Sequence, residues 1–229
     1  MTPARLRFGA VAWLCALLPL VASHAAYLIS ASLEAVPWCL PHLEGCTSVS
    51  RAARSTGPAT VVYKSLLLPY SVLLVLFWWQ AGRWLGELAP ARRRTQRALL
   101  PIGLIAGIAT ATYTAVLGTD GEAQAWIRRY AINVGFGFSV LAELLLAAAL
   151  AREALVPQGL RRALVGLCLA MLALGIASIP LQFLVASRDA AVNAIEWNIG
   201  VLMLVYYPLA GAAWRRSRLG GAPTGPAPA

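Results

Sequence analysis

The chain has 229 residues, of which 59% are hydrophobic and only 12% are charged, and its mean hydropathy is +0.69. This composition excludes an ordinary water-soluble globular domain and places most of the chain in lipid. The formal net charge of +10 could suit nucleic-acid binding, but no stacking aromatic residues are interleaved with the arginines. We therefore expect no nucleic-acid partner.

Six apolar stretches, each long enough to cross a hydrocarbon core of about 30 Å, follow one another along the chain. We expect helices at about 8–33, 61–86, 98–118, 129–151, 163–186 and 193–214. The sequence therefore predicts an all-α polytopic membrane protein. Residues 1–218 form one six-transmembrane-helix bundle, and the Gly/Pro/Ala-rich residues 219–229 form a disordered cytoplasmic tail.

The first stretch also has features of a signal peptide. A basic start and an apolar run precede Ala22-Ser23-His24-Ala25-Ala26, which resembles a cleavage site. The apolar run continues to about Leu33, which is longer than an ordinary signal sequence, and cleavage would leave five helices. We therefore expect an uncleaved first helix.

Positive charge is distributed unevenly among the gaps between these stretches. Thirteen of the 19 Lys and Arg residues lie at the N-terminus, in the second and fourth gaps, and at the end of the last helix. Because short basic loops stay cytoplasmic, we expect both termini in the cytoplasm. Arginine occurs 18 times and lysine once, alongside abundant Ala and Gly, which indicates a GC-rich bacterial genome and hence the inner (plasma) membrane.

The four cysteines divide by depth. Cys15 and Cys168 lie inside apolar stretches, where a thiol usually acts as a small packing residue. Cys39 and Cys46 share the first outward loop and can close a disulfide ring if their geometry allows. A zinc site formed by these two cysteines and His42 lacks a fourth ligand at a familiar spacing, so we expect no metal and no cofactor.

Polar residues recur near the outer ends of the predicted helices. Their positions place them within about two helical turns of the outer interface, where the headgroup of an amphiphile lies. A belt of snorkelling side chains would give the same pattern. The candidates for contact with a lipid headgroup are His24, Ser48, Ser50, Arg51, Arg54, Arg129, Asn133, Glu196 and Trp197.

Glu196 is the most informative of these residues. It lies about one turn into the last predicted helix, where a carboxylate is costly unless it is protonated, paired or facing a wet cavity. A paired Glu196 would either hold a headgroup or lock two helices together. The candidate partners at this depth are Arg51, Arg54, Arg129 and His24.

Glu143 is a second acidic residue inside an apolar stretch. It lies nearer the cytoplasmic half and has no evident basic neighbour. A proton relay between Glu143 and Glu196 would indicate a transporter, and it would need a continuous polar path between the two acids.

Three short segments stand out near the outer ends of the predicted helices: Cys46-Thr-Ser-Val-Ser50, Tyr130-Ala-Ile-Asn-Val-Gly-Phe136 and Asn193-Ala-Ile-Glu-Trp197. They resemble the DRAM (damage-regulated autophagy modulator) family, which includes Frag/Sfk-type proteins and GPI-anchor remodelling proteins with a CWH-type N-terminal domain. The resemblance implies six transmembrane helices, a Pro-Ser-Ile-Ser-like loop segment and an acidic-aromatic pair opening the last helix. The chain departs from the family pattern at the start of the fourth helix, where many members have a histidine.

The resemblance implies a role connected with membrane lipids, and two classes of function follow. In the first, the bundle binds lipid headgroups and has a regulatory role, with phosphate held by Arg51, Arg54 or Arg129. In the second, it is a lipid-remodelling acyltransferase or hydrolase. Glu196 or His24 would then be the general base, within about 3 Å of Ser48 or Ser50. A proton-coupled small transporter is a third possibility.

Overall fold

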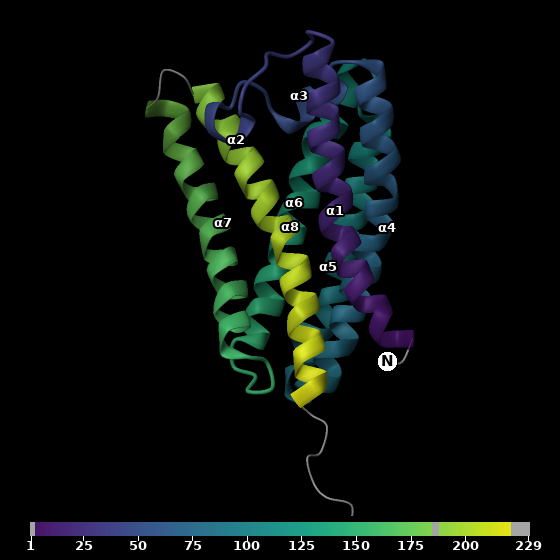
Figure 1. Ribbon diagram of the computed structural model, residues 1–229, viewed down its shortest axis with the longest axis vertical. Helices are drawn as coiled ribbons and strands as arrows, with labels where there is room; N and C mark the ends of the chain where they lie inside the picture. The colour runs from purple at the N-terminus through teal and green to yellow at the C-terminus, as the bar shows by residue number, and fades with distance from the viewer. Residues whose placement is uncertain (1–2, 185–187, 221–229) are drawn as a thin grey trace, which may run out of the picture.

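The computed structural model describes residues 3–184 and 188–220 (Figure 1). Within these ranges there is no β-strand. Three short elements accompany the long helices: α2 (Pro41–Glu44), α3 (Val49–Arg54) and the 3-10 helix η1 (Pro90–Arg92). The long helices are α1 (Pro3–Ser32), α4 (Gly57–Leu88), α5 (Arg93–Val116), α6 (Glu122–Leu150), α7 (Gln158–Leu184) and α8 (Arg188–Gly220).

Six membrane-spanning helices in an all-α bundle are confirmed, because six helices are long and apolar enough to cross a bilayer. Several begin before the apolar stretch that predicts them. For example, α4 begins at Gly57 instead of 61, because the Thr56 hydroxyl accepts from the backbone N–H of Ala59 (3.2 Å) and caps a polar first turn. The predicted tail lies outside the described residues from 221 onward, and α8 ends at Gly220.

The long helices pack mainly against their neighbours in sequence. α1 packs on α4, α4 on α5, α5 on α6 and α7 on α8, while α1 and α8 close the bundle. In α1, Ala22 and Ala26 are fully buried, so the small residues of the cleavage-like segment are packing residues of this helix. Figure 1 shows α7 at the edge of the bundle, and its main contact is with α8.

Aromatic side chains fill the half of the bundle farthest from α3. Phe8 stacks on Phe77 with 5.3 Å between ring centroids, and Phe77 meets Tyr207 edge-on at 4.9 Å. These contacts join α1, α4 and α8 into one tightly packed core. We call this group the aromatic layer: Phe8, Phe77, Trp78, Trp84, Tyr206, Tyr207 and Trp214.

The opposite end of the bundle, here called the α3 end, carries the α2–α3 loop. A disulfide joins Cys39 to Cys46 on either side of α2, with 6.4 Å between their Cα atoms. Side chains of α8 then fasten this loop to the bundle through its backbone. Asn193 donates to the Gly45 carbonyl (2.9 Å), Asn198 to the His42 carbonyl (2.8 Å) and Trp197 to the Thr47 carbonyl (2.9 Å).

Candidate functional site

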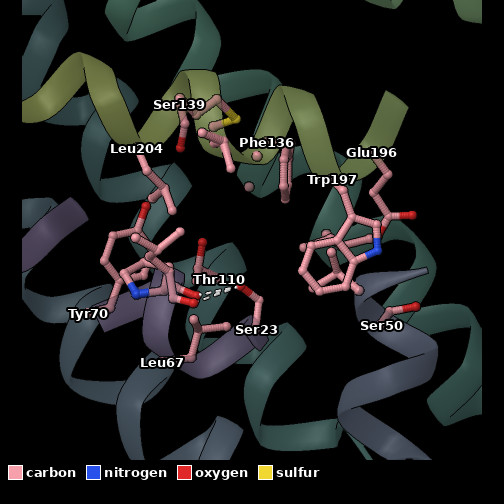
Figure 2. A pocket seen from close by; sticks show the side chains of 18 of the residues that line it. Ser23, Ser50, Leu67, Tyr70, Thr110, Phe136, Ser139, Glu196, Trp197 and Leu204 are labelled. Carbon is pink, nitrogen blue, oxygen red and sulfur yellow. Dashed lines mark hydrogen bonds between the residues drawn. The ribbon is translucent and has the colours of Figure 1, made fainter. Parts of the chain in front are cut away.

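A cavity of about 110 Å³ lies inside the bundle, immediately beneath α3 (Figure 2). Glu196 and Trp197 lie at one end of it beside Ser50, and Tyr70 and Leu204 lie at the other. Most of its wall is apolar. The lining residues are Pro19, Leu20, Ser23, His24, Val49, Ser50, Tyr63, Leu67, Tyr70, Thr110, Tyr113, Ile132, Gly135, Phe136, Ser139, Glu196, Trp197, Gly200, Val201, Met203 and Leu204.

One side of the cavity lies between α6 and α8, which make few contacts with each other. Both helices line it, yet α6 packs chiefly on α5 and α8 packs on α7 and α1. Phe136 of α6 is a lining residue and is also 37% exposed, so it lies at this boundary.

Glu196 finds its polar partners in the backbone of α3. Its carboxylate lies near the backbone N–H groups of Val49 and Ser50, in the first turn of that helix. Unpaired N–H groups at a helix start favour a negative charge. The arginine partners predicted from the sequence are not used, because no salt bridge joins Glu196 to a basic side chain within the described part of the chain.

His24 forms a pair with His42 of α2 at the side of the cavity. The Nε2 atoms of the two rings are 3.2 Å apart, and Nδ1 of His24 lies 2.8 Å from the carbonyl oxygen of Leu20. Since a carbonyl only accepts, Nδ1 of His24 carries the proton and its Nε2 accepts from His42. Both rings contact Trp197 edge-on, with centroid distances of 5.3 Å.

The histidine pair predicts a pH dependence of stability. His42 lies outside the membrane-spanning helices, and its partial burial, followed by the charge of His24, lowers the pKa of its imidazole. The unfolded chain, with an ordinary pKa of about 6.5, then binds the proton better, so stability is lost as the pH falls through that value. We expect a lower Tm at pH 5.5 than at pH 7.5, and a smaller difference in His42→Gln. The same Tm difference between the two pH values in the wild type and in His42→Gln would contradict a role for His42.

The serines considered as nucleophiles have other roles in the structure. Ser48 caps α3 by accepting from the backbone N–H of Arg51 (3.1 Å). Ser23 lies 3.4 Å from Nδ1 of His24, but that nitrogen carries its proton for the Leu20 carbonyl and cannot act as a base. No hydrogen bond between described residues joins the hydroxyl of Ser48 or Ser50 to His24 or Glu196, so no nucleophile–base pair is formed.

The structure brings together four of the nine candidates predicted from the sequence: His24, Ser50, Glu196 and Trp197 line the cavity. The other five lie outside it. Arg51, Arg54, Arg129 and Asn133 are exposed, and Ser48 is the α3 cap. The sequence-based site did not include the α4 wall of the cavity, which Tyr63 and Tyr70 line. Phe77 continues the same face of α4, and the three residues are spaced seven apart. That spacing was the available signal.

Glu143 lies beyond the inner end of the cavity, one helical turn from the lining residue Ser139. It is fully buried, and neither carboxyl oxygen has a well-formed hydrogen bond, although Tyr207 lies beside it. The hydroxyls of Tyr207 and Tyr70 are 3.4 Å apart. No run of hydrogen bonds through the described residues connects Glu143 to Glu196, so the relay stays a prediction without support.

The fold and the cavity define the chain as a six-helix integral membrane protein with an internal cavity. Comparison of the chain with known protein families, with curated proteins and with solved structures finds no match.

Proposed function

We propose that the protein binds a membrane amphiphile in this cavity, with the polar end of the molecule at Glu196 and its apolar part leaving between α6 and α8. One observation carries the proposal: an apolar cavity with a carboxylate at one end is lined by α6 and α8, which make few contacts with each other, and its lining residue Phe136 is also exposed. Ligand sites of this kind combine apolar walls with a few fixed polar groups.

The role we infer is lipid-related and regulatory, since among the described residues no hydrogen bond pairs Ser48 or Ser50 with His24 or Glu196. The similarity of three segments to DRAM/Frag/Sfk-type proteins is in keeping with this role. We further propose that the α3 end faces away from the cytoplasm in a bacterial inner membrane. The basic residues concentrated at the opposite end, such as Arg93, Arg94 and Arg162, support that orientation.

Filling the cavity is expected to displace the bound amphiphile. Gly200 lines the cavity, and a Cβ added there meets no atom within 4 Å, so the Cβ of Gly200→Leu has open space. Leucine also favours the helix more than glycine does. We expect the variant to fold and to lose most of the lipid that the wild type retains in native mass spectrometry from nanodiscs.

The matched control is Gly137→Leu. Gly137 lies on α6, is exposed, does not line the cavity and also has no atom within 4 Å of an added Cβ. This variant should retain lipid like the wild type. Equal lipid retention by wild type, Gly200→Leu and Gly137→Leu would show that the cavity is not a lipid site.

A further inference from the structure

The charge of the cavity lining is one-sided. Glu196 supplies a carboxylate, and no lysine or arginine occurs among the described residues that line the cavity. The carboxylate is compensated only by two backbone N–H groups of α3 and has no cationic partner in the described chain. Since a carboxylate removed from water is costly without a counter-charge, this site favours a ligand that brings positive charge.

Two hydroxyl groups of the lining, those of Ser23 and Thr110, add to this preference, because their protons are already used. Ser23 donates to the Pro19 carbonyl (2.9 Å), and Thr110 donates to the Ala106 carbonyl (2.8 Å). Each hydroxyl oxygen keeps lone pairs and can only accept from a ligand while these bonds persist. His24 is likewise occupied at both ring nitrogens. These two hydroxyls therefore accept from a ligand and do not donate to it.

Positive charge for an anionic group lies outside the cavity. Arg129 is three residues before the lining residue Ile132, so both lie on the same side of α6, one turn apart. It is exposed, and its guanidinium makes no hydrogen bond or ion pair with another described residue. A phosphate at the mouth of the cavity could be held there, whereas inside it would be repelled by Glu196.

Resting on the proposed function, we infer that the amphiphile is a phospholipid with a primary ammonium headgroup, of the phosphatidylethanolamine class. Its ammonium group donates to the Glu196 carboxylate inside the cavity, and its phosphate meets Arg129 at the mouth. A quaternary ammonium headgroup has the same charge but no N–H donor, so it cannot make these hydrogen bonds.

A series of headgroups that differ only in N-methylation tests this inference. Nanodiscs would contain equal amounts of phosphatidylethanolamine, its N-methyl and N,N-dimethyl derivatives and phosphatidylcholine, all with distinguishable acyl chains of the same length. Native mass spectrometry then measures which lipid stays bound. We expect retention to fall with each methyl group, by about tenfold over the series, because a hydrogen bond to a charged group is lost.

Two variants identify the groups responsible. Glu196→Gln keeps an oxygen that can accept from α3 but removes the charge, and it should abolish the ranking by methylation. Arg129→Gln, at an exposed position, should weaken retention of all four phospholipids while the ranking persists. If the wild type retains all four phospholipids equally, this inference is overturned and the proposed function stands. The same holds if phosphatidylglycerol or a neutral glycolipid, added to the same nanodiscs, is retained in preference to phosphatidylethanolamine. Retention no greater than that of Gly200→Leu would overturn both.

Discussion

Replacing Gly45 with alanine is expected to detach the α2–α3 loop from α8. Gly45 ends α2 with φ of 59°, in the left-handed region that disfavours residues with a Cβ. An alanine Cβ would also lie 2.7 Å from the carbonyl carbon of Ala190 and 2.8 Å from the backbone nitrogen of Ala194. Backbone atoms of a long helix cannot move aside locally, so the loop must shift away.

The expected loss of stability is about 2–5 kcal/mol, the sum of the conformational penalty and an overpacking penalty. Thermal unfolding of the purified protein measures it, and hydrogen exchange should rise across residues 39–47. Gly57→Ala is the control, because a Cβ at Gly57 meets nothing within 4 Å and its φ is not positive. Equal unfolding temperatures for the two variants would contradict the close contact of the loop with α8.

Gly103→Ala is expected to separate α4 from α5. Gly103 of α5 lies against the fully buried Trp78 of α4. A Cβ at Gly103 would approach the indole Cδ1 and Cγ atoms to 2.6 Å. Trp78 is held in turn by an edge-on contact with Phe77, at 4.9 Å between ring centroids. We expect a loss of about 1–3 kcal/mol, as for other overpacked cores.

The control for this variant is expected to change the stability in the opposite direction. Gly166 lies on α7 with no atom within 4 Å of an added Cβ, so Gly166→Ala should stabilise that helix by up to about 1 kcal/mol through its higher helix propensity. Both variants are compared by thermal unfolding in the same detergent. A neutral Gly103→Ala would mean that α4 and α5 can adjust their separation freely.

The number and order of the long helices could be predicted because the bilayer imposes a length on every apolar stretch. The helix ends could not, because hydrophobicity stops at the interface while hydrogen bonding continues through polar turns. At α4, for example, Thr56 caps a turn that contains Gly57 and Pro58. Neither residue carries a hydrophobic signal.

The depth of the candidate site in the membrane could be predicted from the sequence, but the residues that line it could not. The rise per residue gives the level of a side chain, whereas the direction in which it points depends on how each helix is rotated in the bundle. Glu196 and Arg129 are at a similar level by sequence, yet the first lines the cavity and the second is exposed. The partner of Glu196 is the backbone of α3, a six-residue helix without an apolar repeat.

The aromatic layer limits the directions in which a bound molecule could travel. The cavity ends near Tyr70 and Ser139, and beyond this level the rings of Phe77 and Tyr207 occupy the centre of the bundle. A lipid held beneath α3 would therefore exchange with only one leaflet of the bilayer. The protein would then respond to the composition of that leaflet without acting as a flippase.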